Sequence, residues 1–266
     1  MAKRIKRRMG GIMKRFIAFF FSALFLLSVF SANALQEEKH FYIKRGCDHA
    51  SPTTDPSFIS AFGDSCFYLD QRSAERGEKK LYLTFDAGYE NGNISKILDV
   101  LKEEKVPAAF FVLSHLIKSE PSLLERMKKE GHLVCNHTAR HKNMARFEKD
   151  AFKNELSALE TLYETQTGNR LDRFYRPPEG TFSFSNLSWA KEMGYKTVFW
   201  SLAYKDWNDE VVPSREKAVE ILKKNTHPGA VVLLHPTTAL NAEILPEMIS
   251  YWRAEGYCFG TLNEIG

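Results

Sequence analysis

The sequence predicts an α/β fold in which parallel strands close into a barrel. From Lys80 onward, short apolar runs alternate with segments of helical period. The runs are apolar on both faces, which is typical of strands that helices cover on each side. Parallel neighbours need a crossover, and one helical segment lies between each pair of runs. Seven such runs favour a (β/α)7-type barrel. An open, doubly wound sheet is the alternative that this pattern also permits.

The expected elements follow one another in strict alternation. The strands are expected at residues 81–86, 108–114, 132–136, 174–177, 197–202, 230–235 and 257–262. The helices are expected at residues 94–104, 121–130, 148–166, 185–193, 215–225 and 241–254. Pro121 stands at a helix start, and Gly131, Gly194 and Gly256 follow helices at the position where a left-handed residue ends them.

The first 34 residues have the three-part pattern of a secretory signal peptide. A basic segment precedes an apolar run at residues 16–30, and small residues around Ala32 and Ala34 offer a cleavage site. The run is short for a membrane span, so we expect cleavage after Ala34, with an uncleaved anchor as the alternative. We therefore expect an exported protein of the cell envelope or the medium. Residues 35–79 lack the alternation and are expected to form an N-terminal extension before a main domain at residues 80–266.

Removal of this segment changes the charge of the chain. Residues 1–34 contain seven Lys or Arg and no acid, and the whole chain has 37 basic and 33 acidic residues. The remainder therefore has 30 basic residues against 33 acidic ones, a formal net charge of −3. A mildly acidic protein gives no reason to expect nucleic acid as a partner, and no protein partner is indicated.

Four cysteines lie outside the signal segment, without the C-x-x-C spacing of a structural zinc site. Cys47 and Cys66 both precede the barrel, and an oxidising compartment would allow them to pair. The sequence leaves this disulfide open. Cys135 and Cys258 lie in strand-like runs and are expected to be small buried side chains.

Reactive side chains follow five of the expected strands. Asp86 ends the first strand, and Arg176 lies in the fourth. Asp206 follows the fifth strand, and His235 ends the sixth. The third strand leads into a pair of histidines. Because active sites of such folds form at the C-terminal ends of the strands, these groups are expected to face one mouth.

Each of these residues also has an ordinary structural explanation. Asp86 could cap the next helix, and Arg176 could be a surface charge. Asp206 could belong to a turn, and His235 could be a histidine satisfied within the core. Of the other histidines, His115 could reach the same mouth. The arrival of several reactive groups at one edge is what favours an active site.

The pair His137 and His141 is the candidate metal site. The spacing i, i+4 would place both imidazoles on one side of a helical turn, where they can ligate one ion. Such an ion polarises a carbonyl and a water molecule, so the pattern predicts metal-assisted hydrolysis.

The remaining groups fit the acid and the base of that reaction. Asp86 would act as the general base and His235 as the general acid. An arginine beside the base keeps it ionised, and a carboxylate beside the imidazole keeps it protonated. Arg176 and Asp206 are the residues available for these two tasks.

Five ordered motifs, TFDAG, HTARH, RPPEG, DW and LLH, make residues 80–265 similar to the polysaccharide deacetylases of the NodB-homology type, carbohydrate esterase family 4. Within that family, YLTFDAGYENG, RPPEGTFS, TVFWSLAYKDW and HPGAVVLLH resemble the delta-lactam-biosynthetic de-N-acetylases. Those enzymes deacetylate N-acetylmuramic acid in spore-cortex peptidoglycan. The resemblance implies a deformed barrel and the roles given above. It also implies that the backbone amide of Glu179 helps to bind the oxyanion.

One position departs from the broad family. Most members carry a second aspartate after the base, as a third metal ligand, whereas this chain has Ala87. His137 and His141 would then be the only protein ligands, where catalytic zinc usually has three. The muramic-acid branch resembles this chain in that respect. The expected cofactor is one divalent metal ion, with zinc favoured, held weakly and completed by water or an anion.

The expected function is metal-dependent de-N-acetylation of peptidoglycan glycan strands. The alternatives are a degenerate barrel that binds glycan without turnover, and a deacetylase of chitin oligomers or acetylated xylan. The enzyme is favoured over a binding protein, because both the acid and the base have a charged partner that sets their protonation state. Trp207 and Tyr89 could stack on sugar faces, but their spacing does not identify which sugar is bound.

Overall fold

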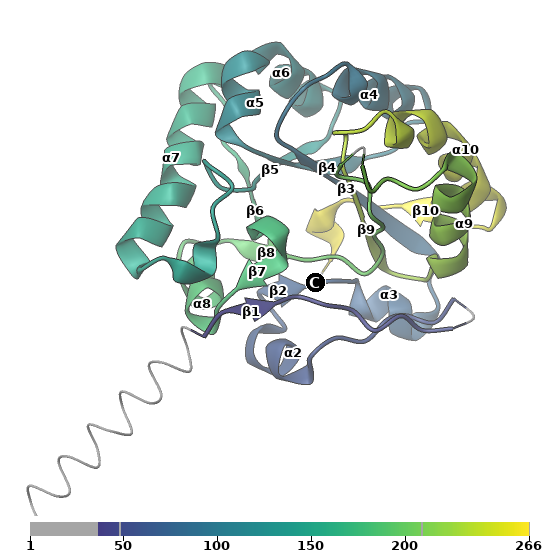
Figure 1. Ribbon diagram of the computed structural model, residues 1–266, viewed down its shortest axis with the longest axis horizontal. Helices are drawn as coiled ribbons and strands as arrows, with labels where there is room; N and C mark the ends of the chain where they lie inside the picture. Colours follow the sequence, from purple (N-terminus) through teal and green to yellow (C-terminus); the bar gives the residue numbers. More distant parts are fainter. Residues whose placement is uncertain (1–36, 48, 209, 266) are drawn as a thin grey trace, which may run out of the picture.

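Helices surround a curled sheet in the computed structural model (Figure 1), which describes residues 37–47, 49–208 and 210–265. The predicted signal peptide lies outside these residues. No helix within them is long and apolar enough to span a membrane.

The main sheet is parallel and curls on itself. Its central strands are β3 (Lys80–Ala87), β4 (Ala108–Val112), β5 (Leu133–Asn136), β6 (Asp172–Tyr175) and β8 (Lys196–Val198), in that order. On its other side β3 pairs with β9 (Ala230–Leu234), and β10 (Cys258–Phe259) pairs with the start of β3. The chain after β8 meets β9 through one bridge, between Leu202 and Val232. The predicted (β/α)7-type barrel is confirmed, and this thin junction is where it is deformed.

Six helices connect the strands and end within one residue of the predicted bounds. They are α4 (Asn93–Glu103), α6 (Pro121–Lys129), α7 (Lys149–Thr167), α8 (Phe184–Glu192), α9 (Arg215–Asn225) and α10 (Leu240–Ala254). Gly131, Gly194 and Gly256 have the expected positive φ. The strand expected at residues 108–114 is shorter, because Ser114 already begins the helix α5 (Ser114–Ser119).

Side chains along β3 point alternately to the outer and the inner side of the sheet, where two separate apolar clusters lie. Phe85 and Ala87 face the outer cluster beneath the helices. Tyr82 belongs to the inner cluster, so Thr84 and Asp86 point to the same inner side. Asp86 is the last of these inward residues and therefore lies at the mouth of the barrel.

The N-terminal residues pair with segments of the main domain. Strand β1 (Lys39–His40) pairs with β7 (Thr181–Phe182), and β2 (Cys66–Phe67) joins the main sheet beside β8. Two helices, α2 (Pro56–Phe62) and α3 (Gln71–Arg76), flank β2 along one edge of the molecule in Figure 1. Three short 3-10 turns complete the fold: η1 (Met144–Arg146), η2 (Pro178–Gly180) and η3 (Leu262–Glu264). The predicted domain boundary at residue 80 stays a prediction.

All four cysteines are free. The disulfide that the sequence left open between Cys47 and Cys66 is absent, because Cys66 is buried in an apolar cluster on β2 while Cys47 is exposed. Cys135 is buried as predicted. The prediction for Cys258 is wrong, because this residue is exposed on the two-residue strand β10.

Candidate active site

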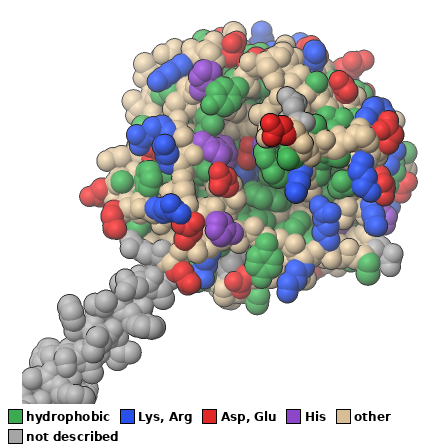
Figure 2. All heavy atoms as spheres, in the orientation of Figure 1, with side chains coloured by type: hydrophobic (Ala, Val, Ile, Leu, Met, Phe, Trp, Pro, Cys, Tyr) green, Lys and Arg blue, Asp and Glu red, His purple; other side chains and the backbone are tan. Residues whose placement is uncertain are grey.

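The C-terminal ends of the strands form a mouth in which the predicted residues meet. Figure 2 shows a hollow near the middle of this face, over the region where Figure 1 labels β3, β4 and β9, with histidine side chains beside it. Asp86 comes from β3, and His137 follows β5. Arg176 follows β6, and His235 follows β9.

Asp86 is a buried carboxylate with one oxygen engaged. Its Oδ1 accepts a hydrogen bond from Nη1 of Arg176 at 2.7 Å. Its Oδ2 lies 3.5 Å from Nε2 of His137 and 4.0 Å from Nε2 of His235. Burial works to raise the pKa of Asp86, but the positive charge of Arg176, which also donates a hydrogen bond, outweighs it, so the pKa lies below its usual value. Asp86 does not cap a helix, since α4 begins after Gly92.

Arg176 is fully buried, so the alternative of a surface charge is wrong. Besides Asp86, it donates to Thr84 Oγ1 at 2.9 Å and to the carbonyls of Val198 and Phe199 at 3.0 and 3.2 Å. Its guanidinium carbon lies 4.1 Å from the centre of the Phe111 ring. These contacts fix the cation inside the barrel, and the cation fixes Asp86.

His137 and His141 lie next to each other, with ring centroids 5.0 Å apart. The predicted helical turn is wrong, because Thr138 and His141 have left-handed φ angles of 73° and 54° and the segment is a bent loop. Nδ1 of His137 donates to the carbonyl of Arg176 at 2.9 Å, which leaves the lone pair on Nε2. Burial lowers the pKa of His137 to about 4, so this imidazole is neutral.

Polar residues that the sequence did not single out hold this loop. The Thr138 amide donates to Oδ1 of Asn136 at 2.9 Å, and the His141 amide donates to Oγ1 of Thr138 at 3.0 Å. Arg140 donates to both carboxylate oxygens of Glu155 on α7. A left-handed β-branched residue is strained, so these bonds stabilise a conformation that the local sequence disfavours.

His235 and Asp206 form the second charged pair. Asp206 is fully buried, so it is no ordinary turn residue; its Oδ1 accepts from Nδ1 of His235 at 2.7 Å. Burial works to lower the pKa of His235, but the hydrogen bond and charge of Asp206 raise it above its usual value. The imidazolium form is therefore favoured, with its second proton on Nε2.

Two further residues orient Asp206, and sequence analysis missed both. Asn241 on α10 donates from Nδ2 to Asp206 Oδ2 at 2.6 Å and to the carbonyl of His235 at 2.9 Å. Tyr204 donates to Oδ1 of Asn241 at 2.7 Å. A buried tyrosine and asparagine thus fix the rotamer of the aspartate.

Exposed aromatic rings border the mouth. Trp207 is 51% exposed, and its ring lies edge-on to His235 at 6.0 Å. Tyr89 is 56% exposed and lies 4.7 Å from the His115 ring, which brings His115 close to this face as well. Glu179, in η2 after Arg176, has a left-handed φ of 57°. The roles of Trp207, Tyr89 and Glu179 toward a substrate stay predictions.

The donor set at the mouth fits a divalent ion, with few protein ligands. Neutral His137, oriented by a carbonyl, and the neighbouring His141 are a pair that suits a transition metal. Ala87 is fully buried in the outer cluster and supplies no donor. In the part of the chain that the structure describes, no group of three or more His, Cys, Asp or Glu side chains is arranged as a metal site. The structure brings the two predicted ligands, His137 and His141, together, and their role as metal ligands stays a prediction.

Comparison with known proteins gives a consistent picture. A family model described as polysaccharide deacetylase matches residues 73–198. The peptidoglycan-N-acetylmuramic acid deacetylase PdaA of Bacillus subtilis is 37% identical over 223 residues, which cover 84% of this chain and 83% of that protein. An uncharacterized 30.6 kDa protein of Geobacillus stearothermophilus is 36% identical over 259 residues, 95% of this chain and 96% of that protein.

A solved structure has the same fold. The structure of PdaA from Bacillus subtilis, described as a family 4 carbohydrate esterase, matches with a TM-score of 0.81 and 36% identity. The match covers 86% of this chain and 97% of that chain.

Proposed function

Because the chain belongs to the polysaccharide deacetylase family, whose members are generally metal-dependent hydrolases, we propose that it removes N-acetyl groups from the muramic acid residues of peptidoglycan. The observation that carries the proposal is a separately tuned acid and base, Asp86 and His235, whose Oδ2 and Nε2 atoms lie 4.0 Å apart. A binding protein has no need of that arrangement.

The residues divide the reaction between them. Oδ2 of Asp86 accepts a proton from the attacking water, since Oδ1 is engaged by Arg176. Nε2 of His235 donates a proton to the departing amine nitrogen, since Nδ1 is engaged by Asp206. His137 and His141 would hold the divalent ion, with zinc favoured, which when bound polarises the acetyl carbonyl and the water. The Glu179 amide would help to bind the oxyanion, and Trp207 and Tyr89 would contact the sugars.

The biological setting is part of the proposal. Similarity to a muramic acid deacetylase supports the route to muramic delta-lactam in spore cortex. The signal-peptide pattern of residues 1–34 supports export to the cell envelope. Both inferences go beyond the fold and the family.

One observation favours a second candidate function. Ala87 cannot ligate a cation, and a barrel that lost its metal would bind glycan without turnover. Acetate release from denuded peptidoglycan strands, with and without added zinc, separates the two candidates. We expect release by the wild type, loss of release in Asp86→Asn, and new free amines on muramic acid rather than glucosamine. Absence of release with added zinc, cobalt or manganese would leave only the binding function. Preference for chitin oligomers or acetylated xylan would overturn the peptidoglycan substrate.

The metal ligands need a measurement of their own. We expect His137→Ala and His141→Ala to lower the bound zinc per chain in equilibrium dialysis. His40→Ala is the matched control, because its side chain is 72% exposed and lies on β1. Equal zinc content in all three variants would contradict the assignment.

A further inference from the structure

A chain of hydrogen bonds connects α7 to the loop that contains His137 and His141. The hydroxyl of Tyr195 donates to Oε1 of Glu160 on α7 and accepts from Nδ2 of Asn136 at 2.9 Å. Tyr195 lies just before β8, and Asn136 is the last residue of β5, directly before the first histidine. Both residues are buried. The proposed reaction assigns no role to Tyr195 or Glu160.

Asn136 holds the backbone of the loop with both groups of its side-chain amide. Oδ1 accepts from the amide of Thr138 at 2.9 Å, and Nδ2 donates to the carbonyl of Leu156 at 3.1 Å as well as to Tyr195. Oγ1 of Thr138 in turn accepts from the amide of His141 at 3.0 Å. Because Thr138 has a left-handed φ of 73°, which a β-branched residue adopts only under strain, the loop depends on these bonds for its shape.

The carboxylate of Glu160 sets the direction of the bonds in this chain. It can only accept, so the proton of the Tyr195 hydroxyl points toward it. Burial and this carboxylate raise the pKa of Tyr195, so the hydroxyl keeps its proton. The lone pairs of the hydroxyl then face Asn136 and select the NH₂ group of its amide, which turns Oδ1 toward Thr138. A reversed amide would place two donors against each other at Thr138.

We propose that Tyr195 is a positioning residue for the metal ligands, and that the bond from Asn136 to its hydroxyl sets the affinity of the chain for zinc. The inference rests on the proposed metal site at His137 and His141. With the bond in place, the loop already has the conformation in which the two histidine rings lie 5.0 Å apart. Without it, a smaller fraction of the molecules has that conformation, and the apparent metal affinity falls by the same factor.

Two buried tyrosines of one apolar cluster provide a matched pair of variants. Tyr195→Phe removes the hydroxyl that contacts Asn136 and Glu160. Tyr175→Phe is the control, because Tyr175 belongs to the same cluster and its ring centroid lies 6.4 Å from that of Tyr195. The Tyr175 hydroxyl is buried and has no hydrogen-bond partner among the described residues. Each variant loses one buried oxygen, but only Tyr195→Phe interrupts the chain of hydrogen bonds.

The measurement is the dissociation constant of zinc, obtained by titration of the metal-free full chain in competition with a chelator. We expect Tyr195→Phe to weaken zinc binding by about tenfold, the lower end of the range for residues that orient a metal ligand. Tyr175→Phe should bind zinc as the wild type does. A tyrosine that only stabilised the fold would lower the melting temperature of the metal-free chain and leave its zinc affinity unchanged.

Glu160→Gln tests the contribution of the charge at the far end of the chain of hydrogen bonds. Arg173 donates to Oε1 of Glu160 at 2.6 Å, so in the variant the amide oxygen takes this position and still accepts from Tyr195. We expect a loss of zinc affinity that is smaller than in Tyr195→Phe, because a neutral acceptor forms a weaker bond than a carboxylate does.

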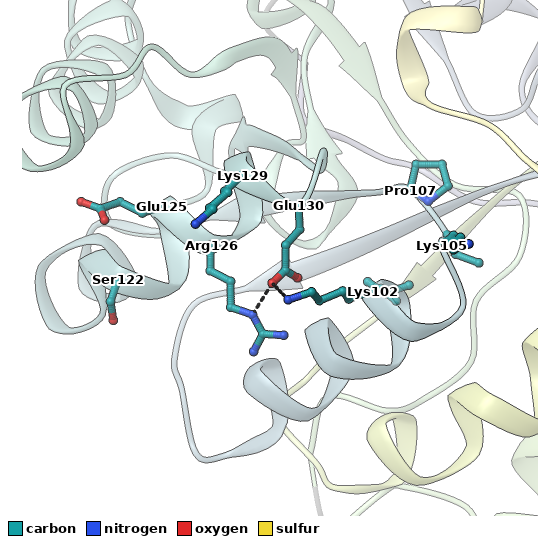
Figure 3. A pocket seen from close by; sticks show the side chains of 10 residues that line it. Lys102, Lys105, Pro107, Ser122, Glu125, Arg126, Lys129 and Glu130 are labelled. Carbon is teal, nitrogen blue, oxygen red and sulfur yellow. Dashed lines mark hydrogen bonds and ion pairs between the residues drawn. The ribbon is translucent and has the colours of Figure 1, made fainter.

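Glu130→Gln is the matched control for this variant. Oε1 of Glu130 likewise accepts from an arginine, Arg126, at 2.7 Å, in the pocket between α4 and α6 (Figure 3). Glu130 precedes β5, whereas Asn136 ends that strand. The control should therefore bind zinc with the affinity of the wild type.

The outcomes separate this inference from the proposed metal site. Zinc binding that is lost in His137→Ala establishes the site. If Tyr195→Phe then keeps the wild-type affinity, or if Tyr175→Phe loses as much, the inference is overturned and the metal site stands. If the wild type binds no zinc, the metal site fails together with the inference.

Discussion

Replacement of Arg176 by methionine tests whether the buried cation stabilises the carboxylate of the base. Arg176 is fully buried and makes hydrogen bonds to Asp86, Thr84 and two carbonyls. Methionine keeps an apolar side chain over Phe111. It leaves the carboxylate of Asp86, whose side chain is only 10% exposed, without its charged partner. Loss of one member of a buried pair costs about 3–5 kcal/mol. We expect a loss of that size in the free energy of unfolding near pH 7.

The dependence on pH gives the sign of the effect. Because the folded-state pKa of Asp86 is lowered, its stabilisation is present above the unfolded pKa of about 3.9 and is lost as pH falls through the folded value. Without Arg176, burial is the main remaining influence and raises this pKa. The deficit of the variant should therefore shrink as the pH falls and the carboxyl group takes up a proton.

Urea unfolding of the single and double variants measures this coupling. Asp86→Asn in the Arg176→Met background removes the unpaired charge and should restore part of the lost stability at pH 7. The control is Arg215→Met, since Arg215 is 49% exposed in its ion pair with Glu247 and should show no resolvable loss. The reasoning fails if the double variant is no more stable than Arg176→Met, or if the control loses as much.

Three further predictions concern the acid, a helix cap and the thiols. Asp206→Asn should lower the pKa of His235. The fall in acetate release at alkaline pH, where the acid loses its proton, should then move to lower pH. If this fall stays at the same pH in a profile of kcat against pH, the role of Asp206 is contradicted. Ser183→Ala removes the side-chain cap of α8 and should cost about 1 kcal/mol in urea unfolding, while equal stability would show that the cap contributes nothing. Thiol titration should count two reactive groups in the folded protein, Cys47 and Cys258, and four in denaturant; a mass that rises by two protons on reduction would reveal a disulfide instead.

The regular part of the fold was predictable because its signals are local. Each of the six predicted helices has its own period and a glycine or proline near an end, so their bounds agree within one residue, whereas α2, α3 and α5 were not predicted. Strands β1, β2 and β7 have two residues each, too few to show a period. They form because distant segments pair with them, and β2 joins the main sheet through β8. Strands that form by such long-range pairing cannot be recognised from a short window of sequence.

The site was predictable as a set of residues, and its internal geometry was not. Charged groups at strand ends indicated Asp86 and His235, and the predicted family is confirmed by the similarity of the chain as a whole. Asn136, which holds the histidine loop, and Asn241, which orients Asp206, look like surface residues in a sequence and are buried only by tertiary contact. The i, i+4 spacing suggested a helical turn for the histidine pair, whereas left-handed residues, the bond from Thr138 to Asn136 and the contact of Arg140 with Glu155 hold a bent loop.

Alanine at position 87 bears on the predicted metal ligands and leaves the acid and base of this site intact. Ala87 faces the outer apolar cluster, while Asp86 faces the interior, so the two neighbours act in different environments. Ionisation of Asp86 depends on Arg176, and protonation of His235 depends on Asp206. Among the described residues, no hydrogen bond or ion pair of Arg176 or Asp206 involves the side chain of residue 87. The charges of the acid and base therefore depend on their own partners, and alanine at position 87 bears only on the predicted metal ligands. A chain that had abandoned catalysis would have no reason to keep two buried ion pairs, each of which is costly when either partner is missing.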